Sequence, residues 1–186
     1  MLNKKIENIL NTTGDKKIAT REAYGTTLAE LGETNKDIVV LDCDLSKSTK
    51  TAVFGKKFPD RFFNMGIAES NMMSVAAGFA SMGKIPFAST FSVFATKRAC
   101  DQVSISVAYP KLNVKICATH SGVTLGEDGA THQAIEDVAI MRAIPNILVL
   151  SPADATETNK VIEKVTEYNG PCYVRLCRGG KSGYFQ

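Results

Sequence analysis

The sequence lacks a paired-cysteine motif, a long apolar run and any block of like charges. Its five cysteines are odd in number and include no Cys-x-x-Cys pair, which argues against a disulfide framework and against a zinc site. Several lie in apolar segments such as residues 114–118, so we interpret them as small buried hydrophobic residues in a reducing compartment. No apolar run approaches the roughly 18 residues that a membrane-spanning helix needs.

The charge balance excludes further classes of function. The net charge is +3, from 22 basic and 19 acidic residues. This balance suits anionic metabolites but falls far short of a nucleic-acid-binding surface. The residues that follow Met1 are mostly polar and differ from the apolar stretch of a secretory signal peptide. We therefore expect a cytoplasmic protein that binds neither nucleic acid nor membrane.

The length limits the domain organisation. A chain of 186 residues, of which 44% are hydrophobic, suits one domain with a substantial core. We find no internal repeat and no low-complexity segment. Residues 1–18 form a polar lead-in, residues 19–178 form the domain, and residues 179–186 resemble the polar, glycine-containing stretches that join domains. We therefore expect a linker to a C-terminal domain that is absent from this chain.

Short apolar runs alternate with segments long enough for helices. The candidate strands are continuous apolar runs at residues 37–42, 84–89, 112–119, 147–151 and 172–176. The candidate helices are residues 20–33, 69–82, 91–108, 133–143 and 153–168, and Asp154 is expected to begin the last of them. Because continuous apolar strands are covered on both faces, the pattern predicts an α/β fold: a doubly wound, mostly parallel sheet with helices on both faces.

Glu69 opens the most apolar candidate helix. In open parallel sheets, ligands bind beyond the carboxyl ends of the strands. A carboxylate at a helix start has an ordinary structural explanation, because the helix dipole favours it there. The alternative is chemical: with Met65, Met72 and Phe91 shielding it from water, Glu69 would hold or share a proton with a ring nitrogen.

Two further groups follow candidate strands. Phe91 and Phe94 are three residues apart and face one side of a helix start, either in the core or toward the ligand crevice. Asp44 and Ser48 belong to a polar run after the first strand. They line the same crevice or serve only as turn and helix-start residues, which is the commoner case.

Residues 118–132 form the one long segment dense in glycine, threonine and acids, and they contain both histidines of the chain. A solvated loop is the simple interpretation. A metal hydrolase would use a set of four potential ligands, but their spacing matches no standard metal site. These residues are His120, Glu127, Asp128 and His132.

The order of these motifs resembles the pyrimidine-binding domain of transketolase from about residue 19 to residue 178. The resemblance rests on residues 19–22, 44–46, 66–69, 90–94, 118–120 and 126–133. The last of these, Gly-Glu-Asp-Gly-x-Thr-His-Gln, is the most specific. It separates transketolase from the related β-subunits of 2-oxo acid dehydrogenases. Deoxyxylulose-phosphate synthase, a closer relative, usually has a different residue at the position of Glu127.

The resemblance implies thiamine diphosphate as cofactor and transfer of a two-carbon ketol unit between sugar phosphates. Glu69 would bond a pyrimidine nitrogen, Phe91 and Phe94 would pack around that ring, and Asp44 would lie near the thiazolium. His132 would act beside Glu69 as the second catalytic residue, near the substrate carbonyl. The remaining residues would bind substrate, Asp128 at a hydroxyl and the others at the phosphate: Arg21, Ser48, His120 and Arg178.

The chain departs from the family pattern at several positions. Ser70 replaces a histidine, Lys97 replaces a third aromatic residue of the pyrimidine pocket, and Ala130 replaces a proline. A Gly-Asp-Gly motif followed about thirty residues later by Asn, which would hold Mg²⁺ or Ca²⁺ and the diphosphate, is missing. The resemblance therefore implies an N-terminal diphosphate-binding subunit or domain as partner, and a homodimer through this domain, with no activity in the chain alone.

Three alternatives remain open at this point. The chain could belong to an enzyme like deoxyxylulose-phosphate synthase or to a 2-oxo acid dehydrogenase β-subunit. It could also be a non-catalytic binding module with the same fold, for which the changes at Ser70 and Lys97 are the support. A self-contained, metal-dependent enzyme is the third.

Overall fold

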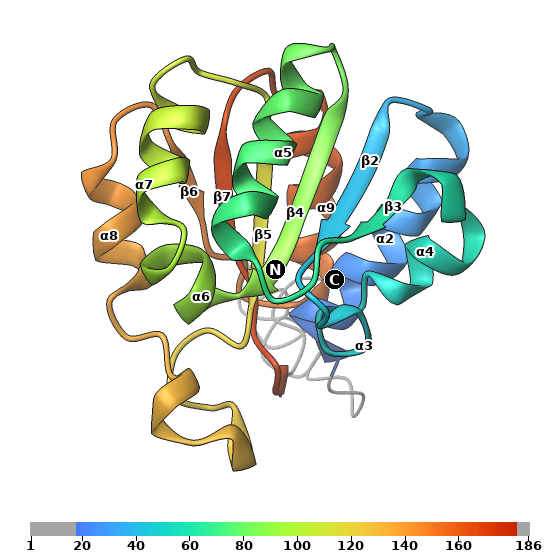
Figure 1. Ribbon diagram of the computed structural model, residues 1–186. Coiled ribbons are helices and arrows are strands. Elements are labelled where there is room, and N and C mark those ends of the chain that lie inside the picture. The colour runs from blue at the N-terminus through green and yellow to red at the C-terminus, as the bar shows by residue number, and fades with distance from the viewer. Residues whose placement is uncertain (1–17, 182–186) are drawn as a thin grey trace, which may run out of the picture.

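The computed structural model describes residues 18–181. The predicted lead-in, apart from Ile18, and the last five residues of the predicted linker lie outside the described residues. In the described part, one sheet lies between two layers of helices (Figure 1). Within it, no helix combines the length and the apolar character needed to cross a membrane.

The central sheet has six strands, all paired in parallel, in the order β3-β2-β4-β5-β7-β6. Their bounds are β2 (Ile38–Asp42), β3 (Phe62–Asn64), β4 (Ile85–Phe91), β5 (Lys115–Thr119), β6 (Leu148–Leu150) and β7 (Cys172–Arg175). All five predicted strands are confirmed. The sequence analysis missed β3, because this edge strand is three residues long and none of its residues is buried.

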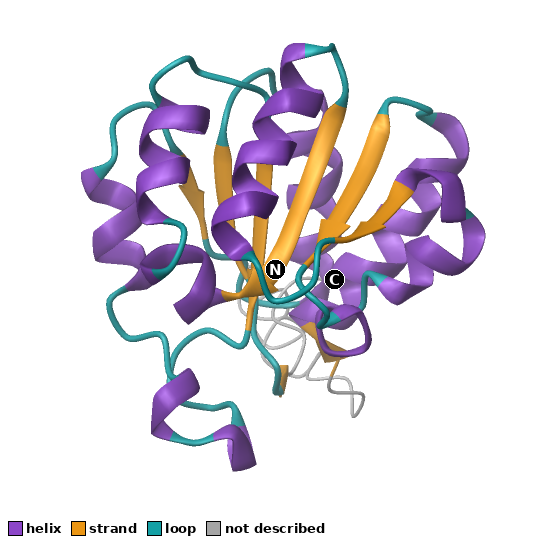
Figure 2. Ribbon diagram, in the orientation of Figure 1, coloured by secondary structure: helices purple, strands orange, loops and turns teal. Residues whose placement is uncertain are grey.

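Helices cover both faces of the sheet, as predicted (Figure 2). The helices are α2 (Thr20–Thr34), α3 (Ser46–Thr49), α4 (Ala52–Lys57), α5 (Glu69–Ser81), α6 (Ser92–Lys97), α7 (Cys100–Gln102), α8 (Asp137–Ala143) and α9 (Ala155–Glu167). Short 3₁₀ turns are η1 (Pro59–Arg61), η3 (Gly126–Asp128) and η4 (Ala130–His132), and η2 (Val103–Ala108) is a π-helical segment.

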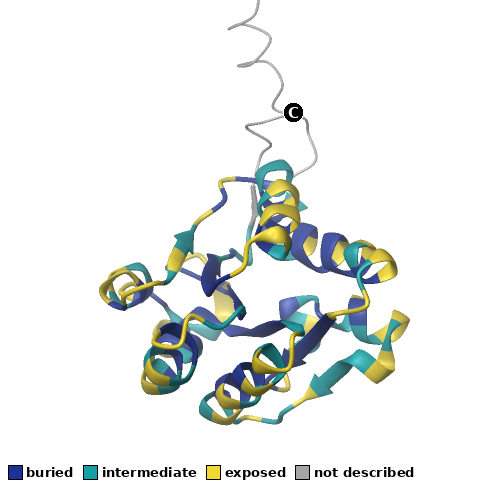
Figure 3. Ribbon diagram, turned by 90° about the horizontal axis from the view of Figure 1, so that it is seen from above, coloured by how far each residue is buried: buried dark blue, intermediate teal, exposed yellow. Residues whose placement is uncertain are grey.

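Two separate apolar clusters explain why the strands read as continuous apolar runs. Leu41 of β2 packs in a cluster with Met72 of α5, whereas the preceding Val40 packs in a second cluster with Leu28 of α2 and Ile162 of α9. Successive strand residues point to opposite faces. Both faces are therefore buried, and the exposed residues gather on the outer sides of the helices (Figure 3).

The predicted single helix over residues 91–108 is wrong. Phe91 remains in β4, because its pairing with Thr119 extends the ladder between β4 and β5. Its backbone is extended, and α6 begins only at the next residue. The helix is then interrupted at Ala99 before α7 continues into η2. The predicted helix over residues 133–143 also begins late, at Asp137, because Ala134 pairs with Gly122 instead.

Two local predictions are confirmed. Asp154 is the N-cap of α9, where its carboxylate accepts a hydrogen bond of 2.8 Å from the backbone N–H of Glu157. All five cysteines are free thiols, and three of them are buried. A feature that was not predicted is the antiparallel pair of β1 (Ile18–Ala19) and β8 (Gly180–Lys181), which joins the two ends of the described chain. The pair lies at the carboxyl-end side of the sheet (Figure 1).

Candidate functional site

Two neighbouring cavities lie where β2, β4 and β5 end. We call the first the carboxylate cavity. It has a volume of about 270 Å³ and is lined by Cys43, Asp44, Leu45, Ile67, Glu69, Phe94, Arg98 and His132. We call the second the cationic cavity. It has a volume of about 310 Å³ and is lined by Arg21, Lys47, Ser48, Lys50, Phe91, His120, Glu127, Asp128 and Arg178.

Glu69 begins α5 and is the acid of the carboxylate cavity. It is 4% exposed, so it is shielded from water as predicted. Its shield is not purely apolar, however. The Arg98 guanidinium donates a hydrogen bond of 2.9 Å to Glu69 Oε1 and also stacks over the Phe94 ring at 3.9 Å from its centroid. Sequence reasoning missed Arg98, because the two residues are 29 positions apart and no local spacing connects them.

Aromatic rings and imidazoles separate the two cavities. The Phe91 and Phe94 rings stack with their centroids 5.8 Å apart. His132 lies edge-on to Phe94 at 5.3 Å, within the carboxylate cavity. His120 stacks on the other ring, Phe91, at 3.8 Å. Phe91 consequently lines the cationic cavity, whereas Phe94 lines the one that contains Glu69.

The surroundings of His120 determine its protonation state. Arg21 Nη1 lies 3.3 Å from His120 Nε2, and Thr119 Oγ1 lies 2.8 Å from His120 Nδ1. Because a guanidinium can only donate, we assign the imidazole proton to Nδ1, which donates to the Thr119 hydroxyl. Burial, together with the charge of Arg21, lowers the pKa of His120 to about 4. His120 is therefore a neutral member of the cationic cavity near pH 7.

The positive charge of this cavity comes from arginine and lysine side chains. Arg178 Nη2 donates to Glu127 Oε1 at 2.6 Å, and Nη1 donates to Asp128 Oδ2 at 2.9 Å and to the carbonyl of Leu125. The hydrogen bond to Glu127 makes the largest contribution to raising the pKa of Arg178, and the charges of Glu127 and Asp128 act in the same direction. Arg21 Nη1 donates to the carbonyl of Ser48 at 2.9 Å.

The loop that carries the two acids depends on glycine. Gly126 and Gly129 flank Glu127 and Asp128 and have φ values of 78° and 73°, a region that favours glycine.

Arg21 Nε is buried and has no hydrogen-bond partner within the described part of the chain. Lys47 and Lys50 also line the cavity, and the sequence analysis missed both. Nothing distinguished them from other surface lysines before the fold brought them to this edge.

The structure groups the predicted site residues into two sets. The four predicted phosphate-binding residues, Arg21, Ser48, His120 and Arg178, line the cationic cavity together with Asp128. Phe91, which was predicted to bind the cofactor ring, also lines the cationic cavity and not the one that contains Glu69. Asp44, Glu69, Phe94 and His132 line the carboxylate cavity. Lys97, one of the departures from the family pattern, forms an ion pair of 3.0 Å with Glu136 and lines neither cavity. Ser70 donates to the backbone carbonyl of Arg98 at 2.7 Å.

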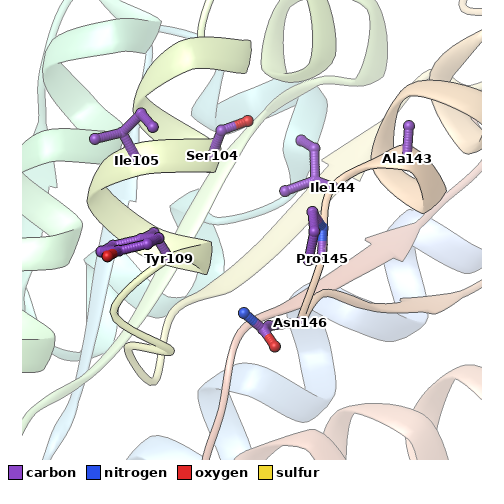
Figure 4. Close-up of a pocket in the computed structure, with 7 residues that line it drawn as sticks. All are labelled: Ser104, Ile105, Tyr109, Ala143, Ile144, Pro145 and Asn146. Atoms are coloured by element: carbon purple, nitrogen blue, oxygen red, sulfur yellow. The ribbon is translucent and has the colours of Figure 1, made fainter.

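A third cavity lies elsewhere in the fold. It has a volume of about 250 Å³ and lies between the η2 segment and the end of α8, where the chain leads into the amino ends of β5 and β6 (Figure 4). Its lining is mostly apolar and includes Ile105, Tyr109 and Pro145.

Among the described residues, no group of three or more histidine, cysteine or acidic side chains is arranged to hold a metal ion.

The fold and the paired cavities define an α/β domain with a polar ligand site at the carboxyl edge of a parallel sheet. Residues 16–180 match the family described as the transketolase pyrimidine binding domain. A putative transketolase C-terminal section from Methanocaldococcus jannaschii is 60% identical over 158 residues, which cover 85% of this chain and 50% of that protein. The chain therefore belongs to the transketolase pyrimidine-binding domain family, and it spans about half the length of this curated relative.

Solved structures agree with this assignment. A split gene transketolase, described as an inactive beta4 tetramer, is 60% identical with a TM-score of 0.82, covering 91% of this chain and 54% of that one. Transketolase from Pichia stipitis in complex with sedoheptulose-7-phosphate is 28% identical with a TM-score of 0.84, covering 92% of this chain and 27% of that one. Their shared fold confirms the predicted α/β architecture.

Proposed function

We propose that this chain supplies the pyrimidine side of a thiamine diphosphate-dependent transketolase, which transfers a two-carbon ketol unit between sugar phosphates. The observation that carries the proposal is the position of Glu69. Its shielded carboxylate shares a cavity with Phe94 and His132, directly beside a cavity rich in arginine and lysine. One cavity suits a flat nitrogen heterocycle, and the other suits a phosphate.

The residues of the carboxylate cavity fit the pyrimidine of the cofactor. Glu69 offers an acceptor shielded from water, and Phe94 offers an apolar ring face. Arg98 donates to one oxygen of this carboxylate, Oε1. When bound, thiamine diphosphate supplies a carbon nucleophile that cleaves and forms carbon–carbon bonds next to a carbonyl. With the cofactor bound, Glu69 would hold the proton at the ring nitrogen, and Asp44, which lines the same cavity, would lie near the thiazolium.

The substrate phosphate belongs in the cationic cavity. Arg21 and Arg178 present guanidinium groups, whose two-pronged geometry matches phosphate oxygens. His120 is neutral and therefore contributes shape and hydrogen bonding, with no positive charge. In this arrangement Asp128 holds a substrate hydroxyl, and His132 lies toward the substrate carbonyl. The sugar phosphate bound by the transketolase from Pichia stipitis supports this substrate class.

The diphosphate side of the site belongs, in this proposal, to a partner subunit or domain. We propose an N-terminal subunit or domain that holds the diphosphate and its Mg²⁺ or Ca²⁺, together with a homodimer through this domain, in the cytoplasm. The similarity to a split gene transketolase supports a separate partner chain, and the description of that structure as an inactive beta4 tetramer supports self-association without activity. Relatives named as a C-terminal section and as a subunit support the same division.

Reconstitution tests the proposal. We expect the isolated chain to show no two-carbon transfer between sugar phosphates when thiamine diphosphate and Mg²⁺ are added. Addition of the diphosphate-binding partner should restore transfer, because the cofactor needs both sides of its site. The coupled assay for ketose formation measures this. Two-carbon transfer by the isolated chain, or no transfer by the complete pair, would contradict the proposal.

One observation favours a second candidate, a binding module without catalysis. Arg98 occupies the carboxylate that the cofactor needs, at 2.9 Å. If the ion pair between Arg98 and Glu69 were permanent, thiamine diphosphate would not reach Glu69. Calorimetric titration of thiamine diphosphate into the assembled pair separates the two functions. Saturable binding supports the transketolase, and its absence supports the module.

A further inference from the structure

Glu127 already places a carboxylate where the cationic cavity would bind an anion. Its Oε1 lies 2.6 Å from Arg178 Nη2, and the same guanidinium also engages Asp128 at 2.9 Å. The Glu127 side chain is 84% exposed, whereas that of Arg178 is 26% exposed. The carboxylate is therefore held mainly by the guanidinium, with little packing around it.

A carboxylate and a phosphate use the same two-pronged guanidinium geometry. A phosphate that takes the place of the carboxylate on Nη2 of Arg178 must therefore displace Glu127, and one that also bonds Nη1 must displace Asp128. The glycines on both sides, Gly126 and Gly129, have positive φ values and allow the acidic turn to change conformation. Asp128 is less exposed, at 30%, and accepts from the other terminal nitrogen of the guanidinium, Nη1.

Resting on the proposed function, we propose that Glu127 is a displaceable internal anion, which phosphate replaces on Arg178 and which sets the affinity of the cationic cavity for phosphate. Two effects act in the same direction. Phosphate binding must first break the ion pair between Glu127 and Arg178, and any carboxylate left nearby repels the incoming anion. Both effects lower the affinity for phosphate.

A displaceable anion explains why an acid stands at this position of a cavity otherwise rich in cations. Arg21, Lys47 and Lys50 also line the cavity, and burial together with Arg178 lowers the pKa of Arg21. Without Glu127, this group of like charges would bind small cellular anions more tightly. Glu127 therefore lowers the affinity of Arg178 for small anions, and a sugar phosphate offsets this loss through the additional contacts that its sugar makes.

Titration with inorganic phosphate tests this inference. NMR signals of the arginine side chains would be followed in the full chain at constant, low ionic strength. Glu127→Gln should bind phosphate about two- to fivefold more tightly than the unaltered chain, because an exposed ion pair contributes modestly. Arg178→Gln should abolish the binding. Glu136→Gln is the matched control: it removes an acid that pairs with Lys97 outside the cavity, and phosphate affinity should not change.

Tighter binding of phosphate that is confined to Glu127→Gln supports the inference. Equal affinity of Glu127→Gln and the unaltered chain would overturn it, as would a similar gain in Glu136→Gln or a lack of phosphate binding in all variants. The reconstitution assay tests the proposed function independently. An active pair with unchanged phosphate affinity in Glu127→Gln would retire this inference alone.

Discussion

His120 shows how one residue acquires an unusual chemistry from its backbone and its neighbours. Its φ of 58° lies in the left-handed region, which is uncommon for residues other than glycine, although asparagine, aspartate and histidine adopt it more often than the rest. This turn at the end of β5 places the ring against Phe91 and beside Arg21. Because the residue is 2% exposed and a guanidinium faces one ring nitrogen, protonation is disfavoured. The sequence analysis predicted that His120 binds the substrate phosphate. Because the ring is neutral, we expect it to do so through a hydrogen bond and not through charge.

The protonation state of His120 predicts a dependence of stability on pH. The ordinary histidine pKa near 6.5 falls to about 4 in the folded chain. The unfolded chain therefore binds a proton below pH 6.5 that the folded chain does not, and stability falls as the pH drops from about 6.5 to about 4. The upper bound of this loss is about 3–4 kcal/mol.

Urea denaturation between pH 7 and pH 4.5 measures this effect. In His120→Asn, which tolerates the left-handed backbone, the loss of stability over this range should be smaller than in the unaltered chain. Identical pH profiles for the two proteins would show that His120 does not contribute. An NMR titration in which the folded imidazole protonates near pH 6.5 would contradict the prediction directly.

At the scale of elements, two helical glycines should respond oppositely to the same substitution. A Cβ at Gly32 of α2 would lie 2.6 Å from the rings of Phe54 and Phe58, whereas a Cβ at Gly78 of α5 would meet nothing within 4 Å. Gly32→Ala should therefore destabilise the fold by about 1–3 kcal/mol through overpacking. Gly78→Ala should stabilise it by about 0.5–1 kcal/mol, because alanine favours the helix. Thermal or urea unfolding measures both changes, and equal signs would refute the packing argument.

The elements also show where sequence patterns succeed and fail. Strands such as β4 and β5 were predictable, because apolar residues recur along each of them and nearly every residue is buried, which leaves no solvent-facing side. The segment over residues 91–108 was mispredicted, because its helical composition cannot reveal that ladder pairing keeps Phe91 extended. The position of Glu69 at a helix start was predictable from its neighbours in sequence. Its contact with Arg98 was not, because tertiary packing alone brings α5 beside the end of α6.

For the whole molecule, the parallel sheet brings residues that are far apart in sequence to one edge. Arg21 near one end of the described chain and Arg178 near the other line the same cavity, next to the acid of α5. This arrangement provides groups suited to a pyrimidine and to a phosphate. In our proposal the groups for a diphosphate and its metal come from the partner. In this proposal, Glu69 holds the proton at the pyrimidine nitrogen of a cofactor that is bound between this domain and the partner.

Turnover of Glu69→Gln in the reconstituted pair tests this claim most directly. Glutamine keeps the shape of the side chain but cannot share a proton as a carboxylate does. We expect turnover to fall by at least about 100-fold, while circular dichroism and thiamine diphosphate binding report a folded, assembled protein. A Glu69→Gln pair that turns over at the rate of the unaltered pair would remove Glu69 from the mechanism and contradict the account.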